Sequence, residues 1–472
     1  MPLEIIDADI HQIDMKTRLP FKYGIATMTE APLVFVRVRV DIDGQECCGI
    51  SSDLLPPKWF TKIPDKPLDA EVDEMRDVVR HAARACIGLR AATAFDLWQN
   101  LSAQQSTWGD AQGYPRLLSN FGTTFTERAV IESCGKAAGQ TFAQMLAHNT
   151  LGVRLQEIDA ALSGTPSDYL THSIRNRVPL RQTIGMADPL TPADIADDEQ
   201  LHDRLPQALT ESVERYALKQ LKVKVSGVAD ADRDRLSQIV RIMQDTGRQW
   251  SFSMDGNELF QSFDQFKDYW EQLSADGMFD KLNLLFVEQP FHRSVALDEN
   301  VLAEFRTWTE RPVTIIDESG SGTDSLPRAL QLGYCGTSHK NCKGVFSSIV
   351  NMCRIRNLQQ EQPHRTLLMS GEDLANIGPV ALLQDLAVAN SLGVVSIERN
   401  GHHYFSGLSS FSTELQNQML NAHPDLYHAS PNGWPTLKVT DGEISLETIN
   451  QAPLGLGFEL DVTEFERLDI QD

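Results

Sequence analysis

Three acidic side chains stand directly after short apolar runs that read as buried strands. Asp255 ends the segment Ser-Phe-Ser-Met-Asp, Glu288 ends Leu-Leu-Phe-Val-Glu, and Asp317 ends Thr-Ile-Ile-Asp. About 30 residues separate one acid from the next, which is one strand plus one helix, so the ends of neighbouring parallel strands would bring them together. Carboxylates without histidine or cysteine suit a hard cation, and we expect one Mg²⁺. A single acid of this kind is as typical of a helix N-cap, so only the succession of three indicates a metal site.

Two lysines occupy another apolar run, Leu221-Lys-Val-Lys-Val225. The side-chain period of two in a strand puts Lys222 and Lys224 on the same face. Two ammonium groups inside a barrel are costly unless an anionic ligand or nearby carboxylates compensate them. An edge strand with its lysines in solvent would give the same pattern, but a closed barrel has no edge strand.

A further lysine follows an unusually polar run. Residues 336–339 read Gly-Thr-Ser-His and precede Lys340. A polar strand is unusual in a barrel and favours a site at its end. Because the second and sixth strands of an eight-stranded barrel lie across from each other, Lys224 and Lys340 could flank a substrate from two sides.

The elements that would position these residues form a regular series. From residue 178 onward, short runs with strand composition alternate with longer helical patterns, which predicts an α/β protein with a (β/α)₈ barrel over residues 178–434. The runs are Val178–Ile184, Leu221–Val225, Trp250–Met254, Leu284–Val287, Val313–Ile316, Gly336–His339, Thr366–Met369 and Val394–Ile397.

The residues before the barrel have a different pattern of strand and helix signals. Leu33–Asp41 has strand composition and leads into the turn Asp43-Gly44, whereas Leu19–Thr29 lacks a clean period and is expected to be a loop. Residues 68–163 are mostly helical in pattern, and a polar break near 165–178 marks a boundary. We therefore expect an α+β domain over 1–170. The tail, 435–472, is expected to return to it and to contain a hairpin, Leu437–Leu446, around Asp441-Gly442.

Composition limits the class of partner. The chain has 472 residues with 42 basic and 65 acidic side chains, a formal net charge of −23, which disfavours nucleic acid. No run of about 18 apolar residues predicts a membrane span, and the acidic N-terminus is unlike a secretory signal. The seven cysteines are scattered, which is typical of free thiols in the cytoplasm.

In combination, these pieces resemble the enolase superfamily, and within it the muconate lactonizing enzyme and dipeptide epimerase branch. The resemblance covers nearly the whole chain and implies a modified barrel with an N-terminal capping domain. It also implies proton abstraction next to a carboxylate, and, by analogy, self-association into homo-oligomers. The matching pieces are Lys222-Val-Lys224, Asp255-Gly-Asn257, Glu288-Gln-Pro290, Asp317-Glu-Ser319, Lys340 and the segment Gly455–Asp461.

The resemblance assigns a role to each position. Asp255, Glu288 and Asp317 would bind Mg²⁺. Lys224 and Lys340 would be the acid/base pair, with Lys222 as an electrostatic helper. The substrate is implied to be a small carboxylic acid, and the reaction racemisation or epimerisation, cycloisomerisation, or β-elimination. Residues implied to lie against the substrate are Asn257, Glu372 and, in a segment that closes over the barrel mouth, Arg18, Lys22 and Tyr23.

Two assignments have competitors. The family usually has a Gly-Gly pair after the sixth-strand lysine, but this chain reads Lys340-Asn-Cys-Lys343, so Lys343 competes as the acid/base. Glu318 competes with Asp317, because a sister branch uses glutamate as the third ligand.

Two other functions stay open. An acid-sugar dehydratase of the mandelate racemase type would need His339 or His364 inside the pocket. A non-catalytic, metal-binding barrel would fit if Lys340 lay outside it. We expect His402 and His403 to face solvent, and His339 to point toward the helices if Lys340 points inward.

Overall fold

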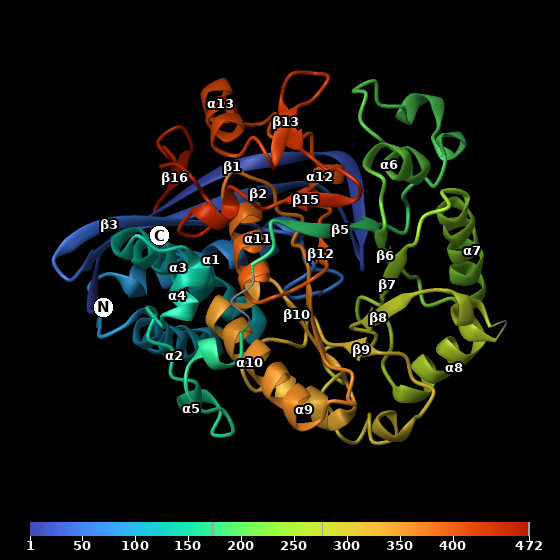
Figure 1. The fold of residues 1–472 in the computed structure, drawn as a ribbon, viewed down its shortest axis with the longest axis horizontal. Coiled ribbons are helices and arrows are strands. Elements are labelled where there is room, and N and C mark those ends of the chain that lie inside the picture. Colours follow the sequence, from blue (N-terminus) through green and yellow to red (C-terminus); the bar gives the residue numbers. More distant parts are fainter. Residues whose placement is uncertain (171–173, 276, 471–472) are drawn as a thin grey trace.

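The computed structural model describes residues 1–170, 174–275 and 277–470. Two sheets organise the chain (Figure 1). The first is antiparallel, in the order β16-β1-β2-β3 with β4 beside β1, and the second is a parallel barrel. The first sheet consists of β1 (Leu3–Tyr23), β2 (Ala26–Ile42), β3 (Gln45–Leu54), β4 (Arg90–Ala91) and β16 (Glu466–Leu468).

Helices cover this antiparallel sheet, and α3 contacts both β2 and β3. They are α1 (Leu68–Cys86), α2 (Ala94–Gln112), α3 (Arg116–Ala138), α4 (Phe142–Ala147) and α5 (Leu155–Ile158). The helical prediction for residues 68–163 is confirmed, and glycine in the left-handed conformation ends α2 and α3, at Gly113 and Gly139.

The prediction of a loop over Leu19–Thr29 is wrong. This segment is the tip of the β1–β2 hairpin, with Phe21 paired to Met28 and a two-residue turn at Gly24-Ile25. Buried and exposed residues do alternate on both sides of that turn. A shift of register between Lys16 and Phe21 interrupts the period in the sequence, which hides the strand.

Each of the eight predicted runs from residue 178 onward overlaps a strand, the eighth only at Ile397, and the predicted barrel is confirmed. Neighbours are parallel in the order β10-β11-β12-β5-β6-β7-β8-β9, and a bridge between Ile316 and Thr337 joins the two ends. The strands are β5 (Arg177–Ile184), β6 (Gln220–Lys224), β7 (Ser251–Asp255), β8 (Leu284–Glu288), β9 (Thr314–Ile315), β10 (Gly336–His339), β11 (Leu368–Gly371) and β12 (Ile397–Glu398).

Helices surround the barrel on its outside (Figure 1). The described connection from β8 to β9 has turns and one 3₁₀ helix, Phe305–Thr307, in place of an α-helix. The α-helices are α6 (Leu209–Tyr216), α7 (Ala229–Asp245), α8 (Phe263–Ser274), α9 (Ser325–Leu332), α10 (Val345–Glu361), α11 (Ala381–Ser391), α12 (Gly401–Tyr404) and α13 (Thr413–Ala422).

The tail binds to both sheets. β13 (Tyr427–Ala429) pairs with β14 (Pro435–Leu437), β15 (Glu443–Ser445) pairs with β5 of the barrel, and β16 pairs with β1. The predicted hairpin is present only as its closing antiparallel bridge, Thr440 with Glu443, and is wrong in the pairing of its arms. The turn at Asp441-Gly442 exists, with φ of 55° and 72°, but the strands on its two sides pair with different partners.

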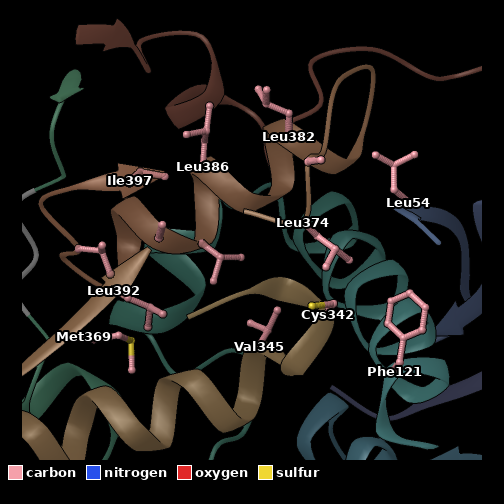
Figure 2. Close-up of a cluster of buried hydrophobic side chains, with 14 of the residues drawn as sticks. Leu54, Phe121, Cys342, Val345, Met369, Leu374, Leu382, Leu386, Leu392 and Ile397 are labelled. Atoms are coloured by element: carbon pink, nitrogen blue, oxygen red, sulfur yellow. The ribbon is translucent and has the colours of Figure 1, made fainter. Parts of the chain in front are cut away.

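One apolar core joins the two sheets. Leu54 at the end of β3 and Phe121 of α3 belong to the same buried cluster as Cys342, Val345 and Leu386 of the barrel (Figure 2). Burying each large apolar side chain contributes about 1.5–3 kcal/mol, so the antiparallel sheet is fixed against the barrel. None of the helices in the described parts of the chain is long and apolar enough to cross a membrane.

Candidate active site

Lys222 lies at the centre of the barrel mouth. Its Nζ is 2.9 Å from Asp255 Oδ2, 2.7 Å from Glu288 Oε2, 2.7 Å from Glu372 Oε2 and 3.0 Å from Glu398 Oε2. Only 1% of its side chain is exposed. Burial alone would lower the pKa of Lys222, but these four carboxylates raise it well above its ordinary value. Lys222 is therefore a permanently charged group that holds four strand ends together.

Lys224 lies on the same face of β6, as the period of two predicts. Its Nζ is 2.6 Å from Asp255 Oδ2, the oxygen that Lys222 also contacts. Burial opposes ionisation of Asp255, but the two ammonium groups together lower its pKa. The backbone N–H of Asn257 donates to the other oxygen of Asp255, at 2.9 Å. Asp255 is thus held from both sides at the end of β7.

Lys340 and Lys343 both contact Asp317. Lys340 Nζ is 2.6 Å from Asp317 Oδ2, and Lys343 Nζ is 3.2 Å from Oδ1 and 3.0 Å from the Asp317 carbonyl oxygen. Burial would raise the pKa of Asp317, but Lys340 and Lys343 hold it well below its ordinary value. Lys340 also lies over the ring of Trp59, at 4.5 Å from its centre. Of the two lysines, Lys340 lines the pocket and Lys343 does not.

Two carboxylates of the mouth have oxygens with unused capacity. Oε1 of Glu288 and Oε2 of Glu318 are buried without a hydrogen-bond partner, and Oε2 of Glu288 has only its ion pair with Lys222, at 2.7 Å. Burial, together with Asp255 and Glu372, raises the pKa of Glu288 well above its ordinary value, since Lys222 compensates it only in part. Burial and the adjacent Asp317 raise the pKa of Glu318 to about 7. The cations of the protein thus compensate these two acids incompletely, which favours their protonated forms.

This donor set fits a hard divalent cation in its chemistry. Asp255, Glu288 and Asp317 offer only oxygen atoms at adjacent strand ends, and those of Glu288 have capacity to spare. Among the described residues, however, no three His, Cys, Asp or Glu side chains already stand in an arrangement that could hold a metal ion. In this structure, Lys222, Lys224 and Lys340 form ion pairs with these carboxylates.

Three charged residues of the mouth are not predicted by the sequence interpretation: Asp373, Glu398 and Arg181. Glu398 ends β12 just as Asp255 ends β7, so the same strand-end rule would have found it. Arg181 of β5 points into the barrel, where it pairs with Glu372 and donates to Ser370 Oγ and Ser396 Oγ, each at 2.9 Å. In the sequence, Arg181 cannot be told from an arginine that faces solvent. Which residues of β5 face inward becomes clear only when the strand is placed in the closed barrel.

Apolar side chains form the opposite wall of the pocket. Phe21, Tyr23 and Met28 come from the β1–β2 hairpin, and Pro56 and Trp59 from the segment after β3. Leu374 and Ala375, after β11, complete this wall. The free space inside is about 30 Å³, which has room for only a few water molecules.

Some of the residues expected to contact the substrate line the pocket, and others do not. Tyr23 and Asn257 line the pocket, although the Tyr23 hydroxyl donates to the Pro57 carbonyl at 2.8 Å. Glu372 lies below it, bound to Lys222. Arg18 and Lys22 do not line it, which corrects both predictions. Arg18 pairs with Asp203 and donates to the carbonyls of residues 205, 206 and 403, and Lys22 faces solvent because it alternates with the buried Phe21 and Tyr23.

No histidine lines the pocket in the described part of the chain. His339 Nδ1 lies 2.8 Å from Ser348 Oγ of α10, as period two predicts, and His364 is exposed. The observation that would favour an acid-sugar dehydratase is therefore not found. The expectation that His402 and His403 face solvent is wrong, since His403 is buried and His402 half-buried under the packing of α12 against β1.

Comparisons with known proteins support the fold. No family model and no curated protein matches the chain. Among solved structures, 2-chloromuconate cycloisomerase from Rhodococcus opacus 1CP matches with a TM-score of 0.62 and 16% identity over 98% of this chain and 100% of its own. Dipeptide epimerase from Enterococcus faecalis V583, complexed with Mg and L-Leu-L-Tyr, matches with a TM-score of 0.60 and 14% identity over 96% and 99%.

A third match is a mandelate racemase/muconate lactonizing protein from Herpetosiphon aurantiacus, with a TM-score of 0.61 and 13% identity over 97% of this chain and 99% of its own. The fold of this chain is therefore that of the enolase superfamily, and the resemblance predicted from the sequence is confirmed at the level of fold.

Proposed function

We propose that this protein is a Mg²⁺-dependent isomerase or lyase that removes the proton from the carbon next to a substrate carboxylate. One observation carries the proposal: two buried lysines, Lys224 and Lys340, line one pocket from opposite sides of a barrel mouth rich in carboxylates. In this proposal the barrel, 178–434, performs the chemistry and residues 1–170, with the returning tail, cover the site.

The positions of the two lysines follow from the order of the strands. Lys224 ends β6, and Lys340 follows β10. Three strands separate β6 from β10 in either direction around the barrel. A planar intermediate lying across the mouth would therefore present one face to each lysine.

The carboxylates would hold the metal. Asp255, Glu288 and Asp317 are the proposed ligands, with Glu318 as the competitor for the third position. A bound divalent cation would stabilise negative charge on a substrate carboxylate and weaken the hold of these acids on the neighbouring ammonium groups. Lys222, which remains charged, would add a second positive centre below the substrate.

The lysines would move the protons. Nζ of Lys224 would take the proton from the α carbon on one face, and Nζ of Lys340 would return a proton on the other, which inverts the configuration. With a leaving group on the β carbon, or a new bond formed there, the same site would perform elimination or cycloisomerisation. In the ion-paired arrangement Asp317 raises the pKa of Lys340 above its ordinary value, which suits the proton donor of the pair.

The structural neighbours support an enzyme of this class. They include a dipeptide epimerase complexed with Mg and a dipeptide, and a 2-chloromuconate cycloisomerase. The non-catalytic alternative loses its main support, because Lys340 lies in the pocket.

Exchange of hydrogen for deuterium tests the proposal. The protein is incubated with Mg²⁺ and a panel of carboxylic acids in D₂O, and deuterium at the α carbon is followed by mass spectrometry. We expect exchange into at least one acid, and its loss for one enantiomer of that acid in Lys224→Ala. The matched control, Lys438→Ala, removes an exposed lysine outside the pocket and should retain the wild-type rate. Exchange of both enantiomers at the wild-type rate in Lys224→Ala would refute the assignment of the base.

A further inference from the structure

We infer that the substrates of this site are monocarboxylic acids that carry a compact apolar group, and not dicarboxylates or sugar acids. This inference rests on the proposed function and names its substrate class. It follows from a division of the pocket into a charged floor, made by the ends of the barrel strands, and an apolar roof, made by Phe21, Tyr23, Met28 and Trp59.

The roof is closed and apolar. Phe21 stacks on Tyr404 with ring centres 4.1 Å apart and lies 4.9 Å from Tyr23, while Trp59 lies over Lys340. Only 1% of Met28 and 7% of Trp59 are exposed. A group that inserts between these rings is transferred from water to an apolar surface, which favours alkyl and aryl groups at about 25 cal/mol per Å² buried.

The basic side chains near the roof already have partners. Arg18 is bound by Asp203 and backbone carbonyls. Lys62 contacts Glu258 at 3.2 Å and donates to the Asn257 carbonyl. Arg293 pairs with Glu258 through two nitrogens and donates to the carbonyls of residues 59 and 60. Each of these three cations is therefore already paired with a carboxylate of the protein.

Cations among the described lining residues belong to the floor alone: Lys222, Lys224 and Lys340. The other ionic groups of the lining, Asp373 and Glu398, are acids. A second carboxylate on the substrate would therefore meet aromatic rings and two negative groups, at a cost in desolvation that no counterion offsets.

The roof also disfavours a chain of hydroxyl groups. The Tyr23 hydroxyl is already bonded to the Pro57 carbonyl, so this side chain offers the substrate its ring. Among the described lining residues, the amides Asn257 and Asn400 can bond a hydroxyl, and Oδ1 of Asn400 is buried without a hydrogen-bond partner while its Nδ2 donates to Glu398 at 3.3 Å. A single hydroxyl or N–H next to the substrate carboxylate can donate to this oxygen, whereas the further hydroxyls of a sugar acid would lie unpaired against the rings.

Calorimetry on matched acids tests this class. Wild-type protein with Mg²⁺ is titrated with phenylacetate, succinate and gluconate, and the Kd of each is compared. We expect phenylacetate to bind at least tenfold more tightly than either of the others. Equal or tighter binding of succinate or gluconate would overturn the inference.

Two variants at neighbouring positions test whether the roof disfavours a second carboxylate. Phe21→Lys places an ammonium group in the roof and should tighten succinate binding at least tenfold, with folding checked by thermal melting. Lys22→Met, one residue away, removes a base that faces solvent and should leave succinate binding unchanged. Weaker succinate binding in Lys22→Met would contradict the inference even if Phe21→Lys does not fold.

The outcomes also separate this inference from the proposed function. Tight binding of phenylacetate without α-deuterium exchange into any acid of the panel would refute the proton abstraction and support the substrate class. Exchange found only with dicarboxylates or sugar acids would support the proposed function and overturn the class. Absence of binding by all three acids would overturn the inference.

Discussion

Removing Arg128 should cost a large part of the protein's stability and should loosen one wall of the pocket. Arg128 of α3 and Asp53 of β3 form an ion pair with neither side chain exposed. Arg128 also donates to the Ser52 carbonyl at 2.9 Å, and Asp53 accepts from Asn376 at 2.7 Å. Asn376 directly follows the pocket residues Leu374 and Ala375, so this network connects the antiparallel sheet to the pocket wall.

The magnitude follows from burial. In Arg128→Met the carboxylate of Asp53 stays buried without its cation, and breaking a buried pair in this way costs about 3–5 kcal/mol of unfolding free energy. Asp53→Asn keeps the shape and removes the charge, so the double variant should recover at least half of that loss. Urea unfolding of the wild type, both single variants and the double variant gives the coupling free energy.

The pH dependence has a defined sign. Burial already raises the pKa of Asp53 in the wild type, with Arg128 as the main opposing influence. In Arg128→Met the folded-state pKa rises further, so the loss of stability is greatest above that value and declines as pH falls toward the unfolded value of about 3.9. A loss below about 1 kcal/mol at neutral pH, or a double variant no more stable than Arg128→Met, would refute the reasoning.

Three other outcomes are expected. Mg²⁺ at 100 times its Kd should raise the unfolding free energy by about 2.7 kcal/mol, measured with and without EDTA, and no shift at any Mg²⁺ concentration would contradict the metal site. Lys340→Met should abolish the return of a proton to the α carbon. Lys343→Met should retain measurable α exchange, because of these two lysines only Lys340 lines the pocket. The opposite result for the two variants would make Lys343 the acid/base. Burial raises the pKa of Glu127, which accepts from the N–H groups of Val345 and Phe346, to about 7. Since this value lies above the unfolded one, wild-type stability should fall as pH rises from 5 to 8, by up to about 3 kcal/mol, and Glu127→Gln should flatten that slope in urea unfolding.

The barrel could be predicted because its strands are buried on both faces. Runs such as Leu284–Val287 and Val313–Ile316 are apolar throughout, which is typical of parallel strands covered by helices. Their regular spacing then indicated which residues would gather at the strand ends. Glu398 obeys the same rule and was missed only because the eighth run was not extended to its end.

Features that depend on tertiary contacts could not be predicted. The family resemblance predicts Arg18 as a substrate contact, but its partner Asp203 lies 185 positions away in the chain. His403 faces the interior because α12 packs against β1, again a contact that no local pattern encodes. The partners of the strands around Asp441-Gly442 are likewise set by the docking of β15 on β5.

The stereochemistry of exchange tests the central claim most directly. Each enantiomer of an acid that exchanges is incubated separately in D₂O with wild type, Lys224→Ala and Lys340→Ala, and α-deuterium is measured in the remaining substrate and in its mirror image. With the lysines on opposite faces, each variant should lose exchange of one enantiomer and retain that of the other. Equal loss for both enantiomers in each variant, or no loss in either, would contradict the placement of Lys224 and Lys340 as a pair of acid/base groups.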